Sequence, residues 1–316
     1  MLRLYDSGQR DVVPVEPVRR GQLLLDICGP SLAQPAHVGD LRPVLLADLI
    51  RRTAERRRLA VLASLSRAGD TGRQDGGDER QRAFRDDCAA LGIRPPEFAS
   101  RHELGNLIDI RVGPAQPGEA AGRAQPGDSA GRAQPGEGPG PAAGETPGPA
   151  QPGESPGPAA GEAAGHPVVR RRAESGPVLF EGREPAVILA DLGRRGLDPL
   201  ALRLALLNRG YREPADLSWP ELAAADAELR RWRGRVAEWA TQPSRPLSGE
   251  HAGRVIAAFE DDLTTRAALD ALRALDGDAS IPAGAKFETF AHVDQLLGLD
   301  LASEIGRVPA APPATR

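Results

Sequence analysis

Hydrophobic residues in the first part of the chain form two short apolar runs separated by a stretch with helical spacing. The run at 23–27 leads into a Gly/Pro turn, after which leucine and isoleucine recur at four-residue steps between 45 and 54. Such steps place the side chains on one face of a helix. The second run, at 59–63, follows that helix and predicts a strand parallel to the first.

Two further helices are expected before residue 113. The pattern over 80–92 is that of an amphipathic helix, with Phe84, Cys88 and Leu91 on one side. Ser100 and Glu103 have the spacing of a capping box. The box predicts another helix, which contains Leu104, Leu107 and Ile108.

Between 113 and 167 the sequence becomes a repeat. The unit Ala-Gln-Pro-Gly followed by an acidic residue starts at Ala115, Ala124 and Ala133 and returns at Ala150. The segment has almost no large apolar side chain, so burial cannot offset the cost of ordering the chain. Its glycines do not fall on every third position, which excludes a collagen-like helix. We therefore predict a disordered Pro/Gly linker.

Beyond residue 168 the pattern becomes mainly helical. A short strand is expected at 178–180 and a helix at 185–195, and Asp198 followed by Pro199 predicts the start of the next helix. Ser218 and Glu221 form a second capping box. The helix that it opens carries a seam of apolar residues at steps of three and four, Leu222, Ala225, Leu229, Trp232, Val236 and Trp239. Two more helices are predicted after it, one spanning Val255 to Leu275 and one spanning Phe287 to Leu297.

Composition narrows the class of protein. The chain has 316 residues, a formal net charge of −4, two cysteines and a single lysine, Lys286. The charge argues against an extended nucleic-acid surface, and the cysteine count excludes a disulfide framework. No apolar run is long enough for a membrane span, so we expect a cytoplasmic protein without a membrane partner.

Three groups of residues near the start carry a resemblance to a known family. They are the opening residues 1–6 (Met-Leu-Arg-Leu-Tyr-Asp), the loop at 28–31 (Cys-Gly-Pro-Ser) and the loop at 37–40 (His-Val-Gly-Asp). Together they resemble the beginning of cysteinyl-tRNA synthetase, a class I aminoacyl-tRNA synthetase with a CGxT loop and a HIGH signature. Later segments at 195–203, 211–219 and 259–265 resemble the same family. The family activates cysteine with ATP and transfers it to tRNA.

The resemblance implies a nucleotide site at His37 and Gly39. In the family, the HIGH signature holds ATP at a helix N-terminus, and here the second histidine of the signature is replaced by Asp40. A carboxylate repels a polyphosphate where an imidazole would donate a hydrogen bond. We interpret His37 and Gly39 as a vestigial ATP signature. A loop histidine and a turn glycine without a ligand remain an equal alternative.

Two other functional groups of the family are missing from the pattern. The lysine loop, KMSKS, should lie near residues 185–188, where the sequence reads Pro-Ala-Val-Ile and contains no lysine. Cys28 matches the first zinc ligand, but the segment expected to hold the other ligands is replaced by the repeat. One cysteine does not make a metal site. We therefore expect Cys28 to be a vestigial ligand and predict no zinc. No catalytic residue is predicted.

These observations divide the chain into four predicted segments. Residues 1–112 form a reduced synthetase-like nucleotide-binding region, 113–167 the linker, 168–307 a helical bundle resembling the synthetase stem, and 308–316 a disordered tail. The expected fold is a reduced Rossmann-like α/β half, with two or three parallel strands, plus an α-helical bundle. Half of such a sheet exposes an apolar edge. We expect the C-terminal helices or a partner chain to cover it.

Three functions are compatible with this pattern. The preferred hypothesis is a paralogue of cysteinyl-tRNA synthetase that does not charge tRNA and acts as a binding or regulatory protein with an unidentified protein partner. The second is a residual ligase that uses ATP to activate cysteine or another small amino acid for a different acceptor. The third is an interaction scaffold in which the helical seam at 222–239 contacts a partner. Binding of tRNA is not expected in the preferred case.

Overall fold

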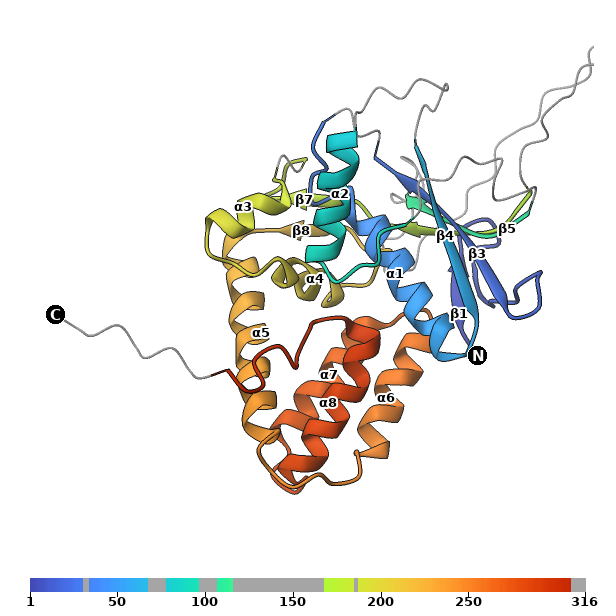
Figure 1. Ribbon diagram of the computed structural model, residues 1–316. Coiled ribbons are helices and arrows are strands. Elements are labelled where there is room, and N and C mark those ends of the chain that lie inside the picture. The colour runs from blue at the N-terminus through green and yellow to red at the C-terminus, as the bar shows by residue number, and fades with distance from the viewer. Residues whose placement is uncertain (31–33, 68–77, 97–106, 116–167, 185–186, 308–316) are drawn as a thin grey trace, which may run out of the picture.

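The computed structural model describes six stretches of the chain, residues 1–30, 34–67, 78–96, 107–115, 168–184 and 187–307. They form an α/β part and a helical part (Figure 1). The predicted linker lies outside the described residues except for 113–115, and the predicted tail at 308–316 lies outside them entirely.

The α/β part is built on a four-stranded parallel sheet with the strand order β4-β3-β5-β6. β3 (Gln22–Gly29) pairs with β4 (Ala60–Arg67) and with β5 (Leu107–Pro114), and β5 pairs with β6 (Val168–Ser175). The predicted parallel arrangement of β3 and β4 is therefore confirmed. Leu25 of β3 lies in register with Ile110 of β5, and both side chains are buried.

Helix α1 (Leu41–Arg56) is the central element of the molecule. One side of it packs against β3, β4 and β5, and the other side contacts α6 and α8 of the helical part. A helix that is covered on both sides needs apolar residues over most of its circumference. Leucine, isoleucine, valine and alanine fill these positions, and Asp48 and Arg51 are buried among them. Each fully buried aliphatic side chain contributes about 1.5–3 kcal/mol to this packing.

The N-terminal hairpin lies beside the sheet. β1 (Arg3–Asp6) and β2 (Asp11–Pro14) pair in antiparallel fashion, and the amide of Ser7 donates to the carbonyl of Arg172 in β6 (3.0 Å). Leu2 and Leu4 are buried. The β6 edge of the sheet is thus contacted by the chain's own N-terminal hairpin, which the sequence did not suggest, and coverage by a partner chain stays a prediction.

The helical part begins with short elements. A parallel pair, β7 (Val178–Phe180) and β8 (Ala215–Leu217), joins the two ends of this region. Between them lie α3 (Leu189–Arg194) and α4 (Pro199–Leu207). The predicted N-cap of α4 is confirmed, because the carboxylate of Asp198 accepts from the amide of Leu200 (2.8 Å). Helix α2 (Asp78–Ala90), between β4 and β5, confirms the helix predicted there.

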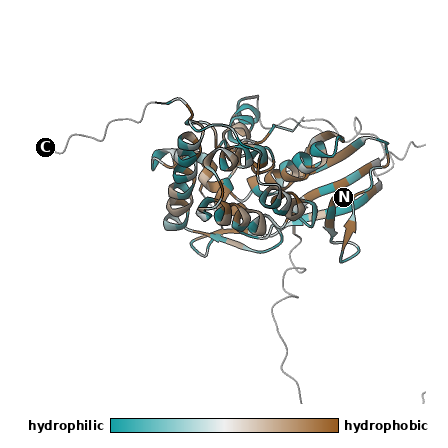
Figure 2. Cartoon of the chain, turned by 90° about the horizontal axis from the view of Figure 1, so that it is seen from below, coloured by the Kyte–Doolittle hydropathy of each residue, from teal (hydrophilic) through white to brown (hydrophobic). Residues whose placement is uncertain are grey.

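Four longer helices complete the chain: α5 (Trp219–Trp239), α6 (Gly249–Glu260), α7 (Thr265–Gly277) and α8 (Ala283–Leu297). Ser218 caps α5 by accepting from the amide of Glu221 (3.4 Å), as the capping box predicts. All six residues of the predicted seam are buried. α5 contacts α4 and α8 of the same chain. Figure 2 shows hydrophobic and hydrophilic residues side by side on these helices, as expected where one face is covered.

Several sequence predictions are wrong in detail. Leu107 and Ile108 lie in strand β5, not in a helix, and Ser100, Glu103 and Leu104 lie outside the described residues. The helix predicted from 185 starts only at Leu189. Strand β6 was not predicted, so the sheet has one or two strands more than expected.

The helix predicted from Val255 to Leu275 is in fact two helices. They are separated at Asp262 and Leu263, whose backbone φ angles are +57° and +48°. The carboxylate of Asp262 accepts from the amide of Tyr5 (2.8 Å) and from the hydroxyl of Tyr211 (2.7 Å). This break therefore attaches the first strand of the chain to the helical part. Non-glycine residues adopt positive φ values where surrounding contacts fix them.

Among the residues that the structure describes, we find no helix with both the length and the apolar character needed to cross a bilayer.

Candidate functional site

The predicted nucleotide loop lies at the carboxyl end of β3, immediately before α1. In parallel α/β sheets this is where ligands bind, because strand ends, loops and helix N-termini converge there. Cys28 is the second-to-last residue of β3, and His37, Gly39 and Asp40 lie just before α1. The structure therefore places all four predicted residues at the same end of the sheet.

His37 and Asp40 interact with each other. The carboxylate oxygen Oδ2 of Asp40 accepts from the backbone amide of His37 (3.0 Å) and lies 3.3 Å from its Nε2. The amide of Asp40 in turn donates to the carbonyl of His37 (2.9 Å). The His37 and Asp40 side chains are 41% and 26% exposed. A negative group of the protein thus already occupies the N-terminal end of α1, where a helix favours an anion.

The loop also pairs with the segment that precedes α3. His37 forms an antiparallel bridge with Ile188, and the amide of Val38 donates to the carbonyl of Val187 (2.9 Å). Residues 187–188 belong to the stretch where the family's lysine loop was expected. The structure thus brings together the two regions that the sequence had singled out separately. Pro185 and Ala186 of that stretch lie outside the described residues.

One buried cation lies beside this loop, and sequence reasoning missed it. Arg42, in the first turn of α1, donates to the carbonyls of Gly176 (2.9 Å), Pro177 (3.0 Å) and Gly210 (2.9 Å). Burial and the neighbouring Arg209 lower the pKa of Arg42 to about 10. Its donors are directed at backbone carbonyls of the β6–β7 connection and of the loop after α4. Arg42 is therefore a structural cation that fixes the start of α1.

The surroundings of Cys28 do not resemble a metal centre. Gly113 of β5 approaches so closely that a Cβ at this glycine would lie 3.2 Å from the Cβ of Cys28 and 3.4 Å from its Sγ. Within the described ranges, no group of three or more His, Cys, Asp or Glu residues could hold a metal ion. The described residues therefore do not supply the ligand set that zinc requires. The expectation about zinc stays a prediction.

The second cysteine, Cys88, is fully buried on α2. Burial and the nearby carboxylates of Asp87 and Asp48 raise the pKa of its thiol to about 12. A thiol with such a pKa is a core side chain and a poor nucleophile at neutral pH.

The single lysine of the chain lies in the helical part. Lys286 belongs to the first turn of α8, is 5% exposed and donates from Nζ to the carbonyl of Asp276 at the end of α7 (2.8 Å). Its ammonium group also lies 5.5 Å from the ring centroid of Trp239. Burial lowers its pKa. Lys286 is thus held by the packing of α7 and α8, and the His37–Val38 loop contacts Val187 and Ile188 instead.

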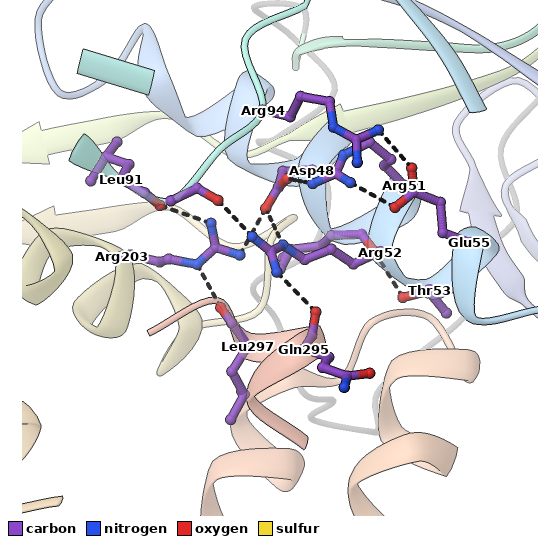
Figure 3. Close-up of polar contacts among 12 residues, drawn as sticks. Asp48, Arg51, Arg52, Thr53, Glu55, Leu91, Arg94, Arg203, Gln295 and Leu297 are labelled. Atoms are coloured by element: carbon purple, nitrogen blue, oxygen red, sulfur yellow. Dashed lines mark hydrogen bonds and ion pairs between the residues drawn. The ribbon is translucent and has the colours of Figure 1, made fainter. Parts of the chain in front are cut away.

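A second charged cluster, which we name the Asp48 hub, lies halfway along α1 (Figure 3). It consists of Asp48, Arg51, Arg52 and Arg203. Asp48 Oδ2 accepts from Arg52 Nε (2.7 Å) and Arg203 Nη2 (2.8 Å), and Oδ1 accepts from Arg51. The side chains of Asp48 and Arg203 are completely buried. Burial by itself would raise the pKa of Asp48, but Arg203, Arg52 and Arg51 outweigh it and lower that pKa.

The hub connects distant parts of the chain. Arg203 of α4 donates to the carbonyls of Leu297 (2.6 Å) and Leu91 (3.0 Å). Arg52 of α1 donates to the carbonyls of Gln295 (2.9 Å) and Gly92 (2.6 Å). The C-terminal ends of α2 and α8 are therefore both bound to α1. The only sequence signal for the hub is an aspartate on an otherwise apolar helix face, which sequence reasoning did not use.

Comparison with known proteins identifies partial relatives. The chain is 35% identical over 144 residues to the L-cysteine:1D-myo-inositol 2-amino-2-deoxy-alpha-D-glucopyranoside ligase of Thermobispora bispora, which is 43% of this chain and 34% of that protein. It is 32% identical over 114 residues to the cysteine–tRNA ligase of Streptococcus pneumoniae, 32% of this chain and 25% of the relative. It is 45% identical over 60 residues to cysteine–tRNA ligase 1 of Burkholderia lata, 19% of this chain and 13% of the relative. No family model matches the chain.

The matched segments span about a third of the length of these relatives or less. The resemblance seen in the sequence is confirmed by these matches: over part of its length the chain is cysteinyl-tRNA synthetase-like, and it is similar both to tRNA ligases and to ligases of an amino sugar.

Proposed function

We propose that this cysteinyl-tRNA synthetase-like chain is a binding or regulatory protein that does not attach cysteine to tRNA. The observation that carries the proposal is the contact of His37–Val38 with Val187–Ile188. In the family the lysine loop, which the resemblance places near 185–188, supplies ammonium groups that stabilise charge on the phosphates. Here the residues that contact the His37–Val38 loop, Val187 and Ile188, are apolar. The one lysine of the chain is buried between α7 and α8.

Weak or absent ATP binding follows from the position of Asp40. A phosphate at the N-terminus of α1 would meet the Asp40 carboxylate, which already accepts from the amide of His37. The two negative charges repel each other. One surface charge at a helix end changes the affinity for an anion by a factor of a few. The Nδ1 atom of His37 is buried and has no hydrogen-bond partner among the described residues, so it does not face a ligand in this structure.

The scaffold itself supports a binding role. We infer that the four-stranded sheet is the first half of a Rossmann-like domain and that α5–α8 form a bundle like the synthetase stem. The residues described do not fit the zinc site of the family, so selection of cysteine by a metal is not part of the proposal. We expect the partner to be a protein in the cytoplasm.

The test is ATP binding by calorimetry with a pair of opposed variants. We expect the wild-type chain to bind ATP weakly, with a Kd above about 1 mM. Asp40→His removes the carboxylate and restores a donor, so affinity should rise about fivefold. His37→Ala should abolish that gain. Tight wild-type binding that His37→Ala destroys would contradict the proposal, because the nucleotide loop would then be intact.

A second candidate function is supported by the relatives named above. One group of them joins L-cysteine to an amino sugar, as their name states. By this analogy the chain would activate cysteine, or another small amino acid, for an acceptor other than tRNA. Exchange of labelled pyrophosphate into ATP, measured with each amino acid in turn, separates the two candidates. A binding protein gives the blank rate with all of them.

The third hypothesis, a scaffold that uses the helical seam of α5, has less support. All six seam residues are buried by the chain itself, so they are not available to a partner in this structure. Co-purification with the full chain remains the way to identify a partner, and its outcome does not depend on the seam.

A further inference from the structure

A cavity of about 820 Å³ lies at the opposite end of α1 from the nucleotide loop. It is bounded by the C-terminal half of α1, the end of α2 and the last turn of α8. Since a helix rises about 1.5 Å per residue, Arg56 lies roughly 24 Å along α1 from Asp40. The cavity is therefore separate from the candidate site described above. Its volume is in the range of small-molecule sites, about 300–1,000 Å³.

The cavity walls are strongly basic. Four guanidinium groups line it, those of Arg51, Arg52, Arg56 and Arg94, together with the single carboxylate of Glu55. The chain as a whole carries a net charge of −4. Clustered arginine side chains in a protein of net negative charge create a local positive potential at the cavity, which attracts anions. Ile93 and Leu296 contribute apolar surface to the same cavity.

Two of these arginines are held in place by the Asp48 hub (Figure 3). Arg51 and Arg52 both pair with Asp48, and Arg52 also donates to the carbonyls of Gly92 and Gln295. Their side chains are only 9% and 17% exposed. The cost of ordering these two cations is therefore met by the fold, and a ligand would find them already positioned.

The other two arginines of the cavity are more exposed to solvent. Arg94 is 65% exposed and Arg56 is exposed in the last turn of α1. Glu55 bridges two of the four cations, accepting from Arg51 Nη1 (2.7 Å) and from Arg94 Nη1 (2.9 Å). Figure 3 shows both guanidinium groups turned toward this carboxylate. Glu55 thus occupies the place that an external anion would take.

We propose that this cavity binds a small phosphate-bearing anion, such as pyrophosphate or a nucleoside phosphate, which displaces Glu55 from Arg51 and Arg94. The planar guanidinium fork matches a phosphate in a bidentate way, and two or more such groups at one cavity favour a multiply charged ligand. A long polyanion such as RNA is disfavoured, because the cavity is local and the rest of the chain is acidic. The proposal does not depend on the proposed function.

The experiment measures binding of inorganic pyrophosphate and of AMP to the full chain by calorimetry at low salt. Arg56→Ala and Arg94→Ala should each weaken binding about 3- to 30-fold, since each removes one charged hydrogen-bond partner. Glu55→Gln should tighten binding severalfold, because it removes the internal competitor. The matched control is Arg266→Ala, which removes one exposed charge on α7 away from the cavity and should leave affinity unchanged.

Several outcomes would overturn the proposal. One is the absence of binding at millimolar pyrophosphate and AMP, which would mean that the arginines serve only to neutralise the C-terminal ends of α1, α2 and α8. A second is weaker binding in Glu55→Gln. A third is an equal loss in Arg266→Ala, which would indicate general charge attraction. Binding of RNA without binding of the small anions would also refute it. Melting temperatures of all variants show that each one is folded.

Discussion

Two charged clusters on α1, one at its start and one at its middle, differ in burial and in the number of elements they contact. At its start, His37 and Asp40 are partly exposed and pair mainly with each other, within one loop. Midway along it, Asp48 is completely buried and bound by cations from α1 and α4. The first cluster is local, and the second holds four regions of the chain together, namely α1, the end of α2, α4 and α8.

This difference indicates which residues are free to change. A substitution in the loop alters one turn and one exposed pair, so it costs little folding free energy. A substitution in the hub leaves a buried charge without its partner, which is costly. Under the proposed function, the hub maintains the synthetase-like frame and the loop no longer supports catalysis. The predictions below test this contrast, starting with the largest effect.

Removal of the hub carboxylate should be the most damaging change. Asp48→Ala takes from the fully buried Arg203 the carboxylate to which it donates, and it frees Arg51 and Arg52 from their shared acceptor. We expect a loss of about 3–5 kcal/mol in the free energy of unfolding, measured by urea denaturation at neutral pH. Glu250→Ala, which breaks the exposed pair with Arg254, is the control and should cost less than about 1 kcal/mol. Similar losses in the two variants would argue against the hub.

Removal of the arginine partner should cost somewhat less. Arg203→Met keeps most of the side-chain volume but removes the donors to Asp48, Leu91 and Leu297. Asp48 keeps Arg51 and Arg52, so we expect a loss of about 2–4 kcal/mol. The same urea experiment measures it, with Arg254→Met as the matched exposed change. The double variant, with both Asp48→Ala and Arg203→Met, tests the coupling of the two residues. If its loss of unfolding free energy equals the sum of the two single losses, the residues are not coupled.

The pH dependence of the free energy of unfolding should distinguish a carboxylate paired with arginines from one whose pKa is raised by burial. The pKa of Asp48 is lowered by its arginines, so the stability it provides is present above its ordinary pKa of 3.8 and is lost as the pH falls through the folded value. Asp87 on α2 is the opposite case: burial and the neighbouring Asp86 raise its pKa to about 6. Its ionisation therefore costs stability as the pH rises from 3.8 through about 6.

Asp87→Asn should consequently raise the melting temperature slightly at pH 7, and the gain should shrink below pH 6 and vanish near pH 4. Thermal scans at these pH values check it. The effect is small because Asp87 is only partly buried. A gain that persists at pH 4 would have another cause.

Disruption of the loop pair should have the smallest effect on stability. Asp40→Asn removes the charge opposite His37 and should change the free energy of unfolding by no more than about 1 kcal/mol. Urea denaturation measures this, beside Asp48→Asn as the hub counterpart. A loss of several kcal/mol from Asp40→Asn would show that the loop is as structural as the hub, and the contrast would then disappear.

The elements that the sequence predicted correctly are those whose signals are local. The spacing in α1, the N-cap Asp198 of α4 and the N-cap Ser218 of α5 depend on residues within one turn or one helix. The seam of α5 was likewise visible, because its apolar period is a property of that helix alone.

The errors arise where distant contacts decide the structure. Strand β5 begins with Leu107 and Ile108, which were predicted to be helical. The carboxylate of Asp109 in this strand accepts from the amides of Leu24 (2.9 Å) and Val18 (2.9 Å), and no local pattern reveals these partners. The break between α6 and α7 depends on contacts of Asp262 with Tyr5 and Tyr211. Strand β6 contains three consecutive arginines, so its sequence does not alternate as a half-buried strand should.

The candidate site was predicted only in part. His37, Gly39, Asp40 and Cys28 were found through the resemblance, and the structure places them at one end of the sheet. The pairing of His37 with Ile188 joins residues 151 positions apart in the sequence, and sequence reasoning assigned no role to Arg42 or Arg203. Burial and partners from other elements gave them their roles, and these are not encoded in spacing.

The most direct test of the central claim is cysteine-dependent exchange of labelled pyrophosphate into ATP by the purified full chain. A frame that keeps its hub and has lost the chemistry of its loop should give the rate of the blank, with cysteine and without it, and Asp40→His alone should not restore exchange. Exchange that requires cysteine and disappears in His37→Ala would contradict the account.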